Sequence, residues 1–121
     1  MREVAAGIYQ LTLPLVHSPL GSVNIYLVRG NDGYLLIDTG WNIHEAFDSL
    51  QKQVAEIGVK LEDISQIVIT HVHPDHYGLA GRLKQLSQAK IALHYLERDI
   101  IETRYVNLER LLQQLAEWLK A

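Results

Sequence analysis

A dense group of metal-binding side chains follows directly on an apolar segment of this chain. Residues 66–70 (Gln-Ile-Val-Ile-Thr) are rich in β-branched side chains, which predicts a strand. The six positions after it contain three histidines and one aspartate: His71, His73, Asp75 and His76. A single histidine would suit an exposed loop, but four such side chains packed together at the end of an apolar strand rarely arise by accident. We therefore predict a metal site here.

The spacing within this group suits metal ligation. Alternate side chains of an extended segment point the same way, so His71 and His73 can face one ion together. Pro74 restrains His73 to extended backbone and fixes its own φ. Asp75 and His76 are adjacent and point differently, so they can reach a second ion. Because the chain has no cysteine, nitrogen and oxygen ligands must hold any metal, and these suit zinc, iron or manganese.

The first part of the chain predicts antiparallel strands. Apolar and polar residues alternate over 4–13, and β-branched and aromatic residues gather in 22–28, so both segments are predicted strands. The turn sequence Gly-Asn-Asp-Gly at 30–33 predicts a hairpin to a further strand at 34–37. That last strand is apolar without alternation, which predicts burial on both of its faces.

The rest of the chain alternates helices with strands, which predicts an α/β protein. Apolar residues at i+3 and i+4 spacing predict a helix over 43–57 that joins two strands as a crossover unit. After the histidines, Gly78 permits a sharp exit into a helix predicted over 79–86, and 91–93 is predicted to be a short strand. From residue 95 the chain is helical in character, with leucines in an apolar stripe.

Length and composition limit the classes of protein to which this chain can belong. With 121 residues and 13.8 kDa, it can form one domain with a hydrophobic core. A net charge of −3 and the absence of a basic block argue against a nucleic-acid partner. No apolar run approaches the roughly 18 residues that a membrane span needs. The N-terminus lacks the apolar core of a secretory signal. We therefore expect a cytoplasmic protein with no membrane partner.

Two motifs of this sequence resemble those of the metallo-β-lactamase superfamily. The first is Leu-Ile-Asp-Thr-Gly at 36–40, and the second is Thr-His-x-His-x-Asp-His-x-Gly at 70–78. They come in the family's order, and each follows a predicted strand. The resemblance implies the metallo-β-lactamase-like αββα sandwich, of which this chain supplies about one half as a mixed sheet with flanking helices. We accordingly expect a single, apparently truncated domain over 1–121.

The resemblance also implies a role for each residue of the group. His71 and His73 would hold a first divalent ion, and Asp75 and His76 a second. Asp38 would support the ligands or their loop without binding metal; alternatively, it caps the helix region that follows. Two ions, by preference zinc and otherwise iron or manganese, lower the pKa of a bridging water, so that hydroxide forms near neutral pH. Asp75 would be the catalytic residue that orients this nucleophile and accepts its proton.

The function that the resemblance implies is hydrolysis of a small-molecule substrate. Metal-bound hydroxide would attack an ester, thioester, lactone or phosphodiester, and a metal would stabilise the developing oxyanion. The oxygen-reducing di-iron branch of the superfamily resembles this motif but carries glutamate where this chain has His73, so histidine favours a hydrolase. The alternative is a non-catalytic metal-binding or dimerising fragment of the same fold that lacks the downstream ligands.

The family pattern continues with a histidine, a bridging aspartate and a final histidine beyond the second motif. After His76 this chain has only His94, which comes too early to match. A zinc ion takes about four ligands, so four side chains shared by two ions leave each ion short. Three explanations stay open: a truncated piece of a longer hydrolase, a single metal held weakly by the local group, or a homodimer that buries the open sheet face of each copy.

Overall fold

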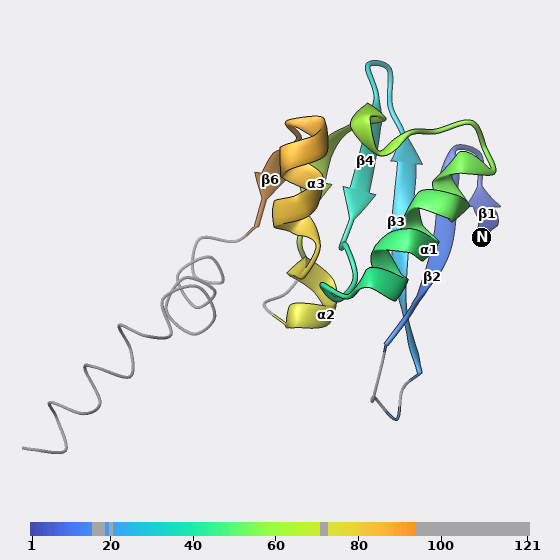
Figure 1. Ribbon diagram of the computed structural model, residues 1–121. Helices are drawn as coiled ribbons and strands as arrows, with labels where there is room; N and C mark the ends of the chain where they lie inside the picture. The colour runs from blue at the N-terminus through green and yellow to red at the C-terminus, as the bar shows by residue number, and fades with distance from the viewer. Residues whose placement is uncertain (16–18, 20, 71–72, 94–121) are drawn as a thin grey trace, which may run out of the picture.

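A six-stranded mixed sheet carries helices on one of its faces (Figure 1). The computed structural model describes residues 1–15, 19, 21–70 and 73–93. Within these residues the strands follow one another across the sheet in chain order. The strands are β1 Arg2–Ala5, β2 Ile8–Pro14, β3 Ser22–Arg29, β4 Tyr34–Ile37, β5 Ile64–Val68 and β6 Lys90–Ala92.

The first four strands pair antiparallel, whereas β5 is parallel to both β4 and β6. The hairpin predicted between β3 and β4 is confirmed, with Gly30 N donating to Gly33 O at 2.8 Å. The strands predicted on either side of it are confirmed to within one residue. The single strand predicted over 4–13 is wrong in one respect. The chain turns at Gly7, whose φ of +75° lies in the left-handed region, so two strands form where one was expected.

Helix α1 makes the connection on which the site depends. It joins β4 to β5, which are parallel neighbours, so the predicted crossover unit is confirmed. Three of its side chains at four-residue spacing, Ala46, Leu50 and Val54, are buried. The helical segments are α1 His44–Ala55, the 3₁₀ turn η1 Leu61–Asp63, α2 Pro74–Tyr77 and α3 Ala80–Ser87.

The end of the described chain also follows the predicted pattern. The helix expected over 79–86 and the strand expected over 91–93 are present as α3 and β6, each shifted by one residue. The helical character predicted from residue 95 lies outside the described residues. Among the helices that the structure describes, none is long and apolar enough to cross a membrane.

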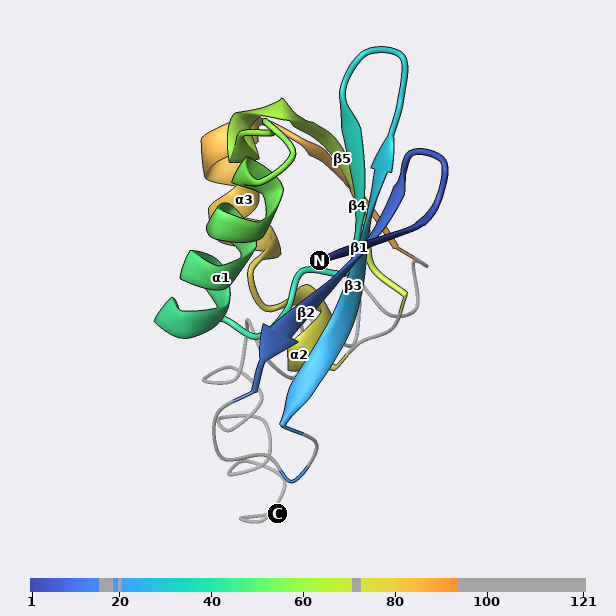
Figure 2. The same ribbon diagram turned by 90° about the vertical axis from the view of Figure 1, so that its right-hand side faces the viewer.

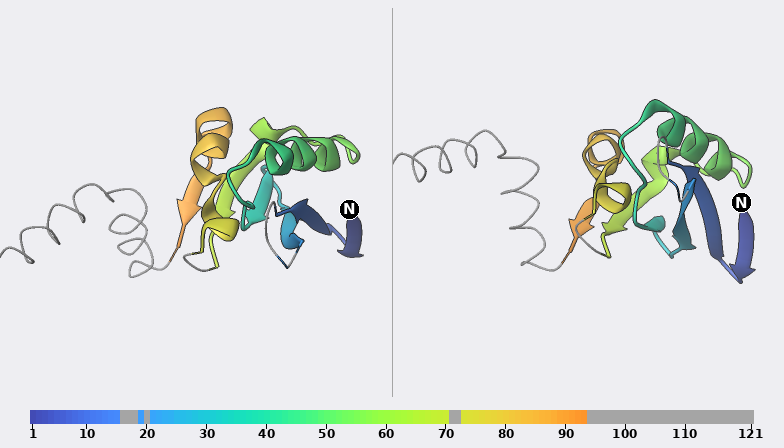
Figure 3. Two further views of the ribbon diagram at one scale, coloured as in Figure 1. Left: turned by 60° about the horizontal axis from the view of Figure 1, so that its bottom comes forward. Right: turned by 90° about the horizontal axis from the view of Figure 1, so that it is seen from below.

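The two faces of the sheet differ in burial. Figure 2 shows α1 and α3 on the same face, and Figure 3 shows that arrangement from below. Side chains under these helices, such as Leu27 and Ile67, are fully buried. On β4, Leu36 is fully buried, but Leu35 and Ile37 on the opposite face keep partial exposure within the described structure. The prediction that β4 is buried on both faces is therefore wrong for the described residues, and an apolar surface remains there.

The homodimer stays a prediction, and this open face is where it would form. Leu35→Lys would place a charge in the apolar interface, so a dimer should become a monomer. Gln51→Lys, at an exposed position on α1, is the matched control and should leave the dimer intact. Sedimentation velocity at micromolar concentration measures both variants. A monomeric wild-type chain contradicts the prediction.

Candidate metal centre

The two sequence motifs meet at one edge of the sheet. β4 and β5 are parallel neighbours, so their carboxyl ends lie together. Asp38 N donates to Val68 O at 2.8 Å, which extends this pairing past the end of β4. Helix α2, which carries the second part of the histidine group, lies at the same edge, at the bottom of Figure 1. This is the edge at which open α/β sheets usually bind ligands.

The buried carboxylate of Asp38 receives hydrogen bonds from both parts of the site. Oδ1 accepts from Thr70 N at 2.8 Å, and Oδ2 accepts from Thr70 Oγ1 at 2.7 Å. Nδ1 of His76 lies 2.9 Å from Oδ2. Asp38 has a φ of +64°, a left-handed conformation that aspartate tolerates better than most residues. Helix α1 begins after Ile43 with no side-chain cap hydrogen bond, so Asp38 does not cap it.

The imidazole of His76 lies between two carboxylates. Its Nδ1 faces Asp38, and its Nε2 lies 3.3 Å from Oδ2 of Asp75. The side chains of His76 and Asp75 are 16% and 25% exposed. A hydrogen on Nδ1, donated to Asp38, leaves the lone pair of Nε2 on the side of Asp75. Two electron-pair donors this close repel each other unless a proton or a cation lies between them.

The separation of these two donors fits one zinc ion. Bonds of about 2.0–2.1 Å at a tetrahedral angle place neighbouring ligand atoms about 3.3 Å apart. Nε2 of His76 and Oδ2 of Asp75 are 3.3 Å apart. The pair therefore has the donor chemistry and the spacing that the predicted second ion requires.

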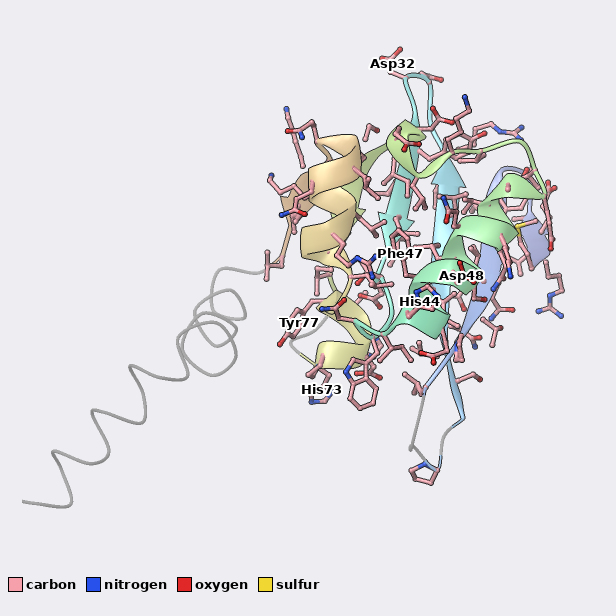
Figure 4. The ribbon with its side chains drawn as sticks, viewed as in Figure 1. Asp32, His44, Phe47, Asp48, His73 and Tyr77 are labelled. Carbon is pink, nitrogen blue, oxygen red and sulfur yellow. The ribbon has the colours of Figure 1, made fainter. Side chains whose placement is uncertain are left out.

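The residues assigned to the first ion are less fully described. His73 lies exposed at the start of α2 (Figure 4). Its φ of −79° and ψ of 141° are extended, as predicted from Pro74 at the start of the helix. Within the described part of the chain, no three histidine, aspartate or glutamate side chains form a group that could hold one ion. His71 lies outside the described residues, so the full ligand set stays a prediction.

Gly78 has a different role from the one predicted. Its φ of −52° and ψ of −41° are helical, so it provides no glycine-specific exit from α2. A Cβ at this position would lie 2.5 Å from Pro74 O, 2.6 Å from Asn42 N and 2.8 Å from Gly40 O. The end of α2 therefore packs against the loop after β4 more closely than any side chain would permit.

Sequence reasoning assigned no role to Thr39 and Gly40, although both belong to the first motif. Thr39 N donates to His76 O at 2.7 Å, and Leu79 N donates to Gly40 O at 3.2 Å. These bonds join the loop after β4 to the end of α2. Their place in the sequence could have indicated these residues, because they directly follow Asp38 at the end of β4. The crossover pairs β4 with β5, the strand that precedes the histidine group.

This chain is similar to known proteins in sequence and in structure. A family model described as the metallo-beta-lactamase superfamily matches residues 18–118. The chain is 53% identical over 60 residues to the probable metallo-hydrolase YqjP of Bacillus subtilis, covering 50% of this chain and 18% of that protein. It is 32% identical over 80 residues to the probable polyketide biosynthesis zinc-dependent hydrolase BaeB of Bacillus velezensis, covering 66% and 32%. A solved metallo-beta-lactamase family protein from Thermus thermophilus, TTHA1429, matches with a TM-score of 0.77 at 34% identity, covering 87% of this chain and 35% of that one.

The chain belongs to the metallo-β-lactamase superfamily. The family match extends over most of its length, and the mixed sheet with flanking helices agrees with the solved structure. The membership and fold expected from the two motifs are therefore confirmed. The chain spans 18%, 32% and 35% of the length of YqjP, BaeB and TTHA1429, respectively.

Replacing the carboxylate of Asp38 tests its place in the site. Asp38→Asn should lower the free energy of unfolding by about 1–3 kcal/mol, because an amide nitrogen cannot accept from Thr70 Oγ1 or His76 Nδ1. Asparagine keeps the size and tolerates the left-handed φ, so the change isolates the carboxylate. Urea denaturation measures the effect. Asp32→Asn, at the exposed hairpin tip (Figure 4), is the control and should change stability by less than about 0.5 kcal/mol. Equal stability of the two variants would refute this role.

A methyl group at Gly78 should separate α2 from the loop after β4. Gly78→Ala is expected to destabilise the chain by about 1–3 kcal/mol, because its Cβ would meet backbone atoms that cannot move aside alone. Gly81→Ala in α3 is the matched control, since a Cβ there meets nothing within 4 Å. It should stabilise the helix by up to about 1 kcal/mol. Thermal unfolding of both variants measures the difference, and a neutral Gly78→Ala would rule out the close packing.

Proposed function

We propose that this chain carries part of the ligand set of a zinc-dependent hydrolase. The observation that carries the proposal is His76 held between Asp38 and Asp75, with its Nε2 and the Asp75 Oδ2 at the spacing of two ligands on one ion. The names of two relatives, a probable metallo-hydrolase and a probable zinc-dependent hydrolase, agree with this chemistry.

Four side chains of the second motif would hold two divalent ions. His71 and His73 would bind the first, and Asp75 and His76 the second. When bound, the ions would lower the pKa of a water molecule so that hydroxide is available near neutral pH, and would stabilise negative charge on the substrate. Nitrogen and oxygen ligands suit zinc, with iron or manganese as the alternatives.

The two carboxylates near His76 would have separate tasks. Asp38 is buried and accepts the hydrogen of Nδ1, so it fixes the ring plane and the tautomer of His76. Asp75 is more exposed, so it can accept a hydrogen bond from the attacking water and then its proton. Asp38 would therefore orient the imidazole of His76, and Asp75 would act on the attacking water.

The substrate that we propose is a small molecule with a carbonyl or phosphoryl centre: an ester, thioester, lactone or phosphodiester. The net charge of −3 offers no excess of basic groups for a polyanionic partner. Histidine at position 73, in place of the glutamate of the oxygen-reducing branch that the motif resembles, supports hydrolysis over redox chemistry.

A second candidate is a non-catalytic metal-binding or dimerising module of the same fold. The ligand arithmetic favours it, because a catalytic zinc usually has three protein ligands and the sequence contains only one histidine after His76.

Metal content and turnover separate the two candidates. The hydrolase predicts about two ions per chain and turnover of ester or phosphodiester substrates that a chelator abolishes and Zn²⁺ restores. Asp75→Asn should lower kcat/KM by about 10²- to 10⁴-fold, because it removes the proton acceptor and a ligand. Elemental analysis of the purified chain and an esterase and phosphodiesterase screen measure both quantities.

His44→Ala is the matched control, because His44 lies exposed at the start of α1 (Figure 4). It should leave metal content and turnover unchanged. Fewer than one ion per chain, together with no turnover, contradicts activity of this chain alone and supports the non-catalytic module or a truncated piece of a longer hydrolase.

A further inference from the structure

The hydroxyl of Thr39 is a buried polar group placed where α2 ends and α3 begins. Thr39 has no exposed surface. Its Oγ1 donates to His76 O at 2.9 Å and accepts from Leu79 N at 3.0 Å. One hydroxyl therefore bridges the backbone of His76, the predicted ligand of the second ion, and the backbone of Leu79, the N-cap residue of α3.

These two partners are backbone groups that helix ends leave unpaired. His76 O lies in the last turn of α2, where carbonyls have no partner within the helix, and Leu79 N precedes the first residue of α3. Helix α2 has four residues, too few to be stable through its own hydrogen bonds. Its position must therefore come from bonds to other parts of the chain.

Backbone hydrogen bonds of Thr39 and Gly40 join the same two segments. Thr39 N also donates to His76 O, at 2.7 Å, and Leu79 N also donates to Gly40 O, at 3.2 Å. Of the four described bonds between these segments, two are made by the hydroxyl and two by backbone groups. The hydroxyl alone contacts both His76 O and Leu79 N. It fixes the distance between His76 O and Leu79 N, and with it the path of the chain through the end of α2.

We propose that Thr39 is a positioning residue for the second metal ion. Asp38 acts on the ring of His76, whereas Thr39 acts on its backbone, so together they fix both ends of one ligand. His73 lies at the opposite end of α2 from the two partners of the hydroxyl. Loss of the hydroxyl should therefore affect the second ion more than the first. This inference rests on the proposed two-ion site, and its test includes a measurement that needs no metal.

Metal titration provides the first measurement. Zn²⁺ or Co²⁺ is added to the metal-free chain and followed by calorimetry, and the second-ion step is identified as the one that Asp75→Ala removes. Thr39→Val removes the hydroxyl at nearly constant volume and should weaken that step by about tenfold or more. Thr39→Ser restores the hydroxyl and should recover most of the affinity. Thr12→Val, the same change at an exposed position on β2, should behave as wild type.

Nuclear magnetic resonance of the metal-free chain provides the second measurement. The Leu79 amide should be protected from hydrogen exchange in the wild type, and Thr39→Val should speed its exchange by about tenfold or more. The imidazole ¹⁵N shifts of His76 should report hydrogen on Nδ1 in the wild type and a mixture of tautomers in Thr39→Val. Thr39→Ser should again resemble the wild type, and Thr12→Val should not differ from it.

Several outcomes would overturn the inference. Wild-type second-ion affinity and a wild-type His76 tautomer in Thr39→Val would do so. An equal loss of affinity for both ions, in proportion to a lower melting temperature, would also overturn it, because it would show a purely structural role. If the wild-type chain binds no ion, the proposed function fails, and the metal-free spectra still decide the place of Thr39. If Thr39→Val does not fold, rapid exchange of the Leu79 amide in the wild type is the result that overturns it.

Discussion

The hydrogen bonds to the Asp38 carboxylate are the interaction on which this site depends. A buried carboxylate costs several kcal/mol unless donors replace its water. Thr70 supplies two donors, and His76 faces the same carboxylate through Nδ1. These partners follow β5 in the chain, whereas Asp38 follows β4, so they meet only because the two strands pair. The α1 crossover that aligns the strands is therefore also what assembles the polar centre.

Close backbone packing extends this dependence to helix α2. Helix α2 is one turn long, and its end lies so near the loop after β4 that a Cβ at Gly78 would lie 2.6 Å from Asn42 N and 2.8 Å from Gly40 O. The hydroxyl and backbone of Thr39 complete the junction. The positions of Asp75 and His76 are thus set by the first motif, although all the ligands that we assign belong to the second.

Local patterns in the sequence were sufficient for the outline of the fold. The crossover and the hairpin follow from periodicity and turn chemistry, which act between near neighbours. The same alternation concealed the turn at Gly7, because the period continues on both sides of it and only the positive φ reverses the chain. The prediction that β4 is buried on both faces was wrong for the described residues. Apolar side chains favour burial, but they do not provide the second layer of structure that would cover the other face of the sheet.

Predicting the site required a different kind of information. The residue types and their spacing indicated metal ligation, since ligand chemistry belongs to individual side chains. The roles of Gly78 and Thr39 could not be read in this way. They depend on atoms that lie next to them in space and far from them in sequence, such as Gly40 O for Gly78 and His76 O for Thr39.

The fold would hold the ligands of the proposed second ion in place before that ion binds. His76 is fixed through its ring by Asp38 and through its backbone by Thr39, and its Nε2 already faces Asp75. Ligands that are held in place before binding lose less conformational entropy when the ion arrives. Binding of the second ion would therefore use ligands that the fold already holds and would stabilise the junction between the two motifs, which couples that ion to the folded sheet edge.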